Sequence, residues 1–134
     1  MDIAVCTFDE KTKILAYAGV TNPVYLISNG LLTEYPAKNY ITNCKDIAVY
    51  KFESEEIQTV KGDTIYIFSD GYPDQFGGRR HQKYQRGRFR SLLLSIQDLP
   101  MAEQRDRLYE EIERWREEND EDQTDDILVI GIKI

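Results

Sequence analysis

The stretch Lys61-Gly62-Asp63-Thr64-Ile65-Tyr66-Ile67-Phe68-Ser69-Asp70-Gly71 decides the fold. Its centre, residues 64–68, is a run of β-branched and aromatic residues, which predicts a strand buried on both faces. A polar turn precedes this run, and the run stops abruptly at Ser69-Asp70-Gly71. A strand buried on both faces needs neighbours, so the rest of the chain must supply the strands and helices that cover it.

Short β-prone segments separated by turns precede the buried strand. The dipeptide Asn29-Gly30 between two of them is a strong hairpin signal. Residues 36–50 carry little pattern and are predicted to form an irregular crossover loop. The predicted strands span residues 2–8, 14–18, 24–28 and 31–35, with a polar edge segment at 52–60.

Two helices are predicted after the buried strand. Before them, residues 77–87 are polar and basic with glycine at both ends, which indicates an exposed loop. Residues 88–97 have a helical composition and end at a Leu-Pro pair. Residues 101–118 are the clearest helix, because one apolar stripe runs among its charges, formed by Met101, Leu108, Ile112 and Trp115.

The chain ends in a nearly uninterrupted apolar strand, residues 127–134. We expect this strand to lie centrally in a sheet, beside residues 64–68, because it is too apolar for an exposed edge. Strands followed by two helices and a closing strand predict an α+β fold with a predominantly antiparallel sheet. At 134 residues, the chain is expected to be a single domain, 1–134.

Composition excludes several classes of protein. The chain is 41% hydrophobic, which is too much for a disordered protein, and no apolar run approaches the roughly 20 residues of a membrane helix. With 17 Lys+Arg against 24 Asp+Glu the net charge is −7, which argues against a nucleic-acid binder. The first residues lack the features of a signal peptide, so a cytoplasmic location is expected.

Cysteine and histidine chemistry has little support. Cys6 and Cys44 lie far apart without a CxxC spacing and are expected to be reduced thiols. His81 is the single histidine and lies in the basic segment. Neither a zinc motif nor a catalytic triad is therefore predicted.

Two acidic segments are candidates for a metal site. Asp70 stands at the tip of the buried strand, and Asp74 can add a second oxygen ligand for a hard cation. Asp125 and Asp126 precede the last strand, where adjacent carboxylates repel each other unless a cation or donors offset them. If the two apolar strands are neighbours, both segments lie at one end of the sheet. An ordinary Asp-Gly turn and simple surface acidity are the alternatives.

A basic segment contrasts with the acidic total. Residues 79–90 contain six Lys or Arg and no acids, whereas residues 102–126 contain twelve acids against four bases. The loop that carries Arg79, Arg80 and Lys83 could hold a phosphorylated peptide or an acidic partner. Alternatively, it is a solvated loop that offsets the nearby acids.

Several segments, taken in order, resemble one family. They are Met1-Asp2-Ile3-Ala4-Val5-Cys6, Ala18-Gly19-Val20-Thr21-Asn22-Pro23-Val24-Tyr25-Leu26-Ile27, the Lys61–Gly71 stretch, Asp74-Gln75-Phe76-Gly77-Gly78 and Asp125-Asp126-Ile127-Leu128-Val129-Ile130-Gly131. This set resembles the metal-dependent protein phosphatases of the PPM (type 2C) family, in its sporulation stage II E-like branch. The resemblance implies a β-sandwich flanked by helices, with a centre of two Mn²⁺ or Mg²⁺ ions at one end. It also implies a reaction in which a water that bridges the two ions attacks the phosphorus of phosphoserine or phosphothreonine.

The resemblance also implies roles for individual residues. Asp70 and Asp125 would be metal ligands, Asp74 would lie near an auxiliary metal, and Gly71 and Asp126 would support the site. The family carries two further acidic motifs upstream, a Gly-Asp pair and a Gly-rich segment with an aspartate, and neither is present here. We therefore expect the carboxy-terminal part of a phosphatase domain, its amino-terminal part missing, with weak metal binding and little or no activity alone.

Three expectations about partners follow. As the output module of a bacterial signalling protein, the domain would act on a phosphoprotein, and neither nucleic acid nor a membrane is expected as a partner of this segment. The alternative is a non-catalytic interaction module that binds an acidic partner through the basic loop 79–90. Strands or helices left uncovered would favour self-association or binding to the missing amino-terminal half.

Overall fold

A computed structural model of the chain describes residues 3–38 and 53–134. The strands are β1 (Ile3–Asp9), β2 (Ile14–Val20), β3 (Val24–Ser28), β4 (Leu31–Tyr35), β5 (Glu55–Gln58), β6 (Thr64–Phe68), β7 (Phe76–Gly77), β8 (Gln82–Lys83) and β9 (Val129–Lys133). The helices are α1 (Gly71–Asp74), α2 (Arg86–Ile96) and α3 (Met101–Glu117). Most of the predicted crossover loop, and Cys44 with it, lies outside the described residues.

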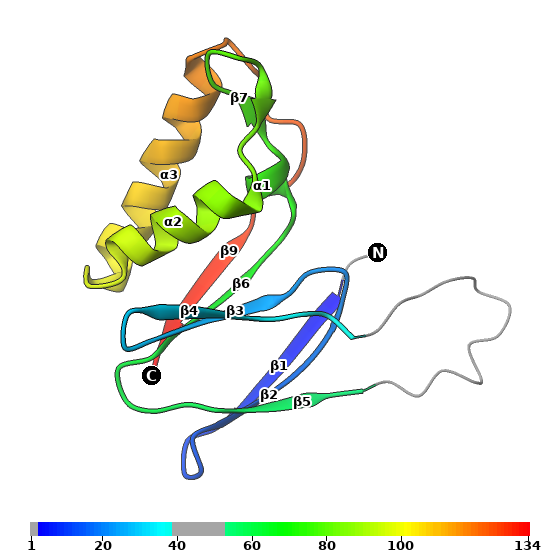
Figure 1. The fold of residues 1–134 in the computed structure, drawn as a ribbon, viewed down its shortest axis with the longest axis vertical. Helices are drawn as coiled ribbons and strands as arrows, with labels where there is room; N and C mark the ends of the chain where they lie inside the picture. Colours follow the sequence, from blue (N-terminus) through cyan, green and yellow to red (C-terminus); the bar gives the residue numbers. More distant parts are fainter. Residues whose placement is uncertain (1–2, 39–52) are drawn as a thin grey trace, which may run out of the picture.

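The described elements form layers (Figure 1). Helices α2 and α3 cover one face of a four-stranded sheet with the order β4-β3-β6-β9, and a three-stranded sheet, β1-β2-β5, lies on its other face. Every strand pair is antiparallel. The predicted antiparallel α+β fold is confirmed. Within residues 3–38 and 53–134 the helices flank only the four-stranded sheet.

Strand β3 is the clearest reason for this layering, because it is buried on both faces. Tyr25 and Ile27 pack with the helices, whereas Val24 and Leu26 pack with the three-stranded sheet. Its neighbour β6 alternates in the same way, as the uninterrupted apolar run 64–68 predicts. Two apolar layers therefore meet on these two strands.

The position of the last strand differs from the prediction. Strand β9 pairs with β6, as expected, with Val129 opposite Phe68 and Gly131 opposite Tyr66. The central position is wrong, because β9 is the last strand of its sheet in the described structure. Ile130 and Ile132 are 42% and 41% exposed. An apolar run predicts that a strand is buried, but it does not show which element of the structure buries it.

The segment 77–87 is only partly the exposed loop that its composition predicts. Strands β7 and β8 form a small hairpin against the end of α3. Gly78 lies so close to Trp115 that a β-carbon would be 2.5 Å from the indole ring. Tyr84 is buried, with its ring centre 5.3 Å from that of Trp115. The aromatic contact between Tyr84 and Trp115 explains why this polar segment is ordered against α3 and not a fully exposed loop. Arg79 and Arg80, near the hairpin turn, remain exposed.

Two smaller predictions concern the thiols and the membrane. Cys6 is a free thiol on β1, and burial raises its pKa. Over the described ranges, we find no helix with the length and apolar character needed to span a bilayer.

Helix α3 is fastened to the sheet by a buried pair of side chains. The Tyr66 hydroxyl on β6 donates a hydrogen bond to Gln104 on α3. The Gln104 amide in turn donates to the backbone carbonyls of Gln97 and Leu99, in the α2–α3 turn. Burial raises the pKa of Tyr66 to about 12.

The raised pKa of Tyr66 predicts a loss of stability at high pH. The folded state favours the neutral phenol, so this contribution is complete below the unfolded pKa of about 10 and disappears as the pH rises towards 12. We expect Tyr66→Phe to flatten the decline between pH 10 and 11.5, and to lower stability at neutral pH by about 1 kcal/mol through the lost hydrogen bond. Urea unfolding measures both effects. The exposed Tyr109→Phe is the control, and equal slopes in the wild type and Tyr66→Phe would contradict the prediction.

Candidate metal site at the ends of strands β6 and β9

Hydrogen bonds join the residue after β6 to the segment before β9. The backbone N–H of Ser69 donates to the carbonyl of Leu128 at 3.0 Å. The Ser69 hydroxyl donates to the carbonyl of Asp126 at 2.8 Å and accepts from the N–H of Leu128 at 2.9 Å. The structure therefore brings the backbones of the two acidic segments to one end of the sheet. The role of Ser69 could not be predicted from the sequence, because serine before an Asp-Gly pair is also an ordinary turn residue.

Gly71 lies directly against the second acidic segment. A β-carbon at this position would be 2.3 Å from the carbonyl oxygen of Asp126, which is far inside van der Waals contact. Any side chain would push the two backbones apart. The glycine after Asp70 is thus explained by a close approach between backbones.

A buried glutamine holds the linker that leads to β9. Gln75 is fully buried, and its side-chain amide donates to the carbonyl of Asp122 at 2.9 Å. Its side-chain oxygen accepts from the N–H of Thr124 at 3.3 Å. The Trp115 indole donates to the Gln75 backbone carbonyl at 3.2 Å. Gln75 therefore fixes the linker to α1 and α3. Because glutamine is usually exposed, its buried role could not be predicted from its residue type.

The four predicted carboxylates have different surroundings. Asp70 is half-buried, and its backbone carbonyl accepts from the N–H of Asp74 across α1. Asp125 is exposed, and its carboxylate accepts from the N–H of Asp126 at 2.7 Å. Asp74 forms an ion pair with Lys83 of the hairpin at 2.8 Å. The carboxylate of Asp126 is exposed, so its contribution here is its backbone carbonyl.

These donors fit only part of a metal centre. In the part of the chain that the structure describes, three or more His, Cys, Asp or Glu side chains do not gather closely enough to hold a metal ion. Mg²⁺ and ions like it are held by one or two carboxylates together with water and substrate oxygens. Asp70 and Asp125 would supply two carboxylates to such an ion. A centre of two metals needs further ligands.

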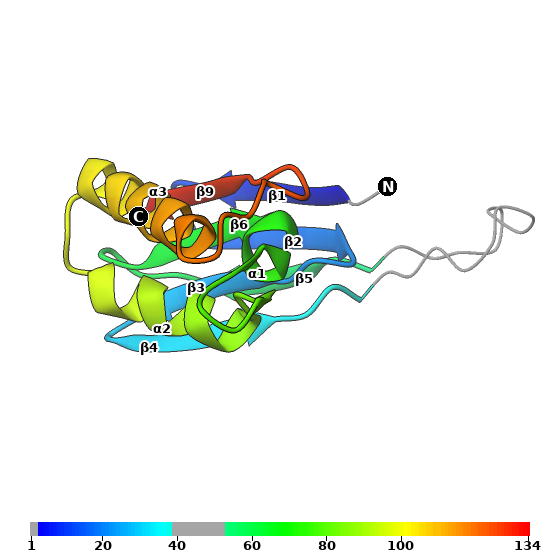
Figure 2. The ribbon, with the colours of Figure 1, turned by 90° about the horizontal axis from the view of Figure 1, so that it is seen from above.

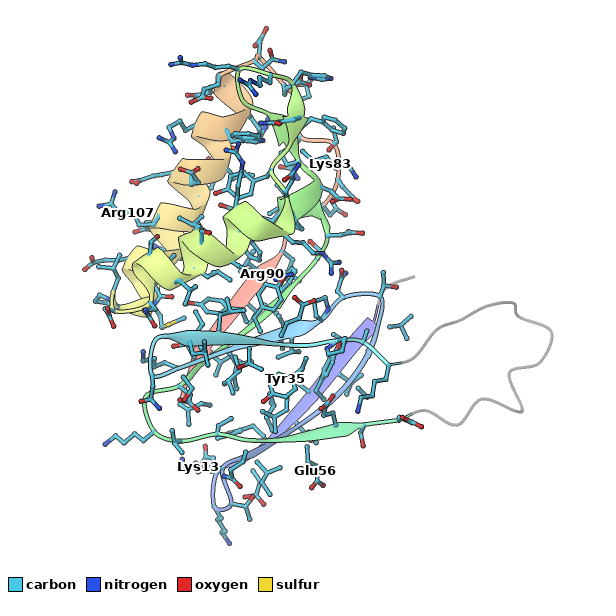
Figure 3. All side chains as sticks on the ribbon, viewed as in Figure 1. Lys13, Tyr35, Glu56, Lys83, Arg90 and Arg107 are labelled. Carbon is cyan, nitrogen blue, oxygen red and sulfur yellow. The ribbon has the colours of Figure 1, made fainter. Side chains whose placement is uncertain are left out.

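Most basic side chains of residues 79–90 are engaged within the chain. Figure 3 shows Lys83 on the β7–β8 hairpin and Arg90 between α2 and the four-stranded sheet. The partners in the described structure are Asp74 for Lys83, Asn22 for Arg86, the Trp115 ring for Arg88, and Glu34 with Tyr25 for Arg90. Arg79 and Arg80 are exposed. This pattern supports the solvated-loop interpretation more than a dedicated partner site.

His81 belongs to the contacts between the hairpin and the linker. Its Nδ1 atom contacts the carboxylate of Glu121 and lies 3.2 Å from the Asn119 amide. Its ring stacks on Phe76, with the ring centres 5.2 Å apart. These contacts give the histidine a structural role.

Comparison with known proteins identifies the family. The model of the family described as Stage II sporulation protein E (SpoIIE) matches residues 1–134. The chain belongs to this family. A comparison with curated proteins finds no match.

Solved structures show the same fold. The SiaA-PP2C domain of Pseudomonas aeruginosa matches 99% of this chain with a TM-score of 0.86 and 22% identity. The phosphatase domain of SpoIIE from Bacillus subtilis, presoaked with Mn, matches 99% with a TM-score of 0.68 and 18% identity. The RsbU and RsbW domains of Rv1364c from Mycobacterium tuberculosis match 98% with a TM-score of 0.69 and 18% identity. The match spans 51%, 56% and 35% of those chains, so this chain corresponds to a partial PP2C-type domain.

The contact between Gly71 and Asp126 gives a direct prediction. Gly71→Ala should destabilise the fold by about 1–3 kcal/mol, because the new methyl group overpacks two backbones. It should also speed amide exchange at residues 126–128. Gly87→Ala is the matched control, since a β-carbon there meets nothing within 4 Å and lies in α2, where alanine is favoured. Equal stability of Gly71→Ala and the wild type in urea unfolding would contradict this account.

Proposed function

We propose that this chain is part of a metal-dependent phosphoserine/phosphothreonine protein phosphatase, an output module of bacterial signalling. The observation that carries the proposal is the hydrogen bond from Ser69, and the close approach of Gly71, to the Asp126 backbone. It places the segments of Asp70 and Asp125 at one end of the sheet. Membership of the SpoIIE family and the PP2C-type fold support it.

The proposal gives each acidic residue a role. Asp70 and Asp125 are ligands of the same Mn²⁺ or Mg²⁺ ion, and Asp74 lies near an auxiliary ion. Gly71 and Asp126 keep the two segments together through their backbones. Carboxylates are suitable for either hard cation, and one relative was solved after presoaking with Mn. These Mn²⁺ or Mg²⁺ ions would be the ones that phosphatases of this family use in phosphate hydrolysis. The substrate would be a phosphoprotein.

The chain alone is proposed to be nearly inactive. The sequence lacks the upstream Gly-Asp pair and the Gly-rich aspartate motif, and the match covers about half of the SiaA-PP2C domain. The ligand that bridges the two metals would therefore come from the other half. Metal binding by the two remaining carboxylates is expected to be weak.

An aryl phosphate assay with millimolar Mn²⁺ tests the proposal. The chain alone should hydrolyse the substrate no faster than Asp70→Ala does. Fusing the unmatched half of the SiaA-PP2C domain ahead of residue 1 should produce Mn²⁺-dependent turnover, and Asp70→Ala or Asp125→Ala should reduce that turnover at least 100-fold.

Two results would contradict the proposal. Rapid hydrolysis by the chain alone, lost in Asp70→Ala, would show that its site is already complete. Turnover in the fusion that is unaffected by both substitutions would remove Asp70 and Asp125 from the site. Glu103→Ala, on the exposed face of α3, is the control for a general loss of negative charge.

A further inference from the structure

A cation of the chain itself already faces the carboxylate of Asp74. The Lys83 ammonium donates a hydrogen bond to the Oδ2 atom of Asp74 at 2.8 Å. The two side chains are 48% and 51% exposed, so water and dissolved ions reach both of them. A metal ion that binds Asp74 must therefore compete with this ammonium group.

Asp74 lies on the same side of α1 as Asp70. The N–H of Asp74 donates to the carbonyl of Asp70 at 2.9 Å, which is the bond of one helical turn. Side chains four residues apart share one face of a helix. The ion pair therefore places the positive charge of Lys83 on the face of α1 that also carries the carboxylate of Asp70.

The position of Lys83 is set by the backbone and not by the ion pair. The N–H of Tyr84, the next residue, donates to the carbonyl of Gln75 at 2.9 Å. The N–H of Gln85 donates to the carbonyl of Pro73 at 2.7 Å. Because these bonds and the buried Tyr84 ring hold this part of the hairpin beside α1, the ion pair is not needed for that purpose.

We propose that the Lys83 ammonium takes the place of the auxiliary metal ion at Asp74, so that an ion binds there only when Lys83 is displaced. The inference rests on the proposed function, which places Asp74 near such an ion. Two cations at one carboxylate repel each other, and Mn²⁺ or Mg²⁺ also needs room for its bound waters. Lys83 therefore weakens the binding of an auxiliary ion, and it sets the metal concentration at which that ion enters.

Mn²⁺ binding to the chain tests this inference without a substrate. The electron paramagnetic resonance signal of free Mn²⁺ during a titration gives the number of bound ions and their affinity. Lys83→Met keeps the aliphatic length of the side chain and removes its charge. We expect this variant to bind Mn²⁺ about threefold more tightly than the wild type, which is the size of an exposed ion pair's contribution. Lys83→Arg keeps the charge and should bind like the wild type.

Further variants assign the gain to Asp74. In Asp74→Asn, the substitution Lys83→Met should no longer change the affinity, because the carboxylate for which the two cations compete is gone. In Asp70→Ala, the gain from Lys83→Met should persist, because the competition takes place at Asp74. Lys61→Met is the matched control, since it removes the same charge from an exposed lysine before β6, at the other end of that strand from Asp70. Circular dichroism checks that every variant is folded.

Three results would overturn the inference. The first is equal Mn²⁺ affinity of Lys83→Met and the wild type, which would leave the pair as a link between the hairpin and α1. The second is an equal gain in Lys61→Met, which would be an effect of net charge. The third is a gain that survives Asp74→Asn. Failure of the proposed function gives a different result, namely Mn²⁺ binding that Asp70→Ala leaves unchanged in the otherwise wild-type chain.

Discussion

The backbone of Gly71 lies against the carbonyl oxygen of Asp126, and the rest of the candidate site depends on this contact. A β-carbon at residue 71 would be 2.3 Å from that oxygen, and Ser69 adds a hydrogen bond to the same carbonyl. These two interactions extend the pairing of β6 and β9 beyond their last ladder residues. As a result, carboxylates 55 residues apart in sequence leave and enter the sheet at the same end. Gln75 then fixes the linker on the other side.

Much of the fold could be predicted because its strands are separated by strong turn signals and differ in polarity. The run 64–68 and the hairpin at Asn29-Gly30 match β6 and the β3–β4 pair residue by residue. The pairing of the last strand with β6 followed from the same polarity argument. Its edge position did not follow, because an apolar sequence indicates burial but does not show which element covers the strand.

The placement of the two acidic segments at one end of the sheet could be predicted, but the residues that hold these segments together could not. Asp70 and Asp125 stand out because charges next to buried strands are costly without a partner. Ser69, Gln75 and Tyr84 carry no such signal, since their roles arise from contacts between segments distant in sequence. The hairpin at 76–83 was missed for the same reason: Trp115, on α3, provides the surface on which it folds.

The architecture divides into a closed and an open side. The helices and strand β4 bound the closed side, whereas on the side of β9 and β1 the inner-face residues Ile130, Ile132 and Phe8 are partly exposed (Figure 2). The acidic segments lie at the end of β6 and β9, and β9 is also an edge of the open side.

Paramagnetic broadening by Mn²⁺ in ¹⁵N-labelled chain tests the central claim most directly, because it maps the ion onto individual amides. At substoichiometric Mn²⁺, broadening should centre on residues 69–74 and 124–127 together, and Asp70→Ala should reduce it in both segments at once. Broadening centred on the acidic residues 117–122, or loss at 69–74 alone in Asp70→Ala, would contradict a shared site.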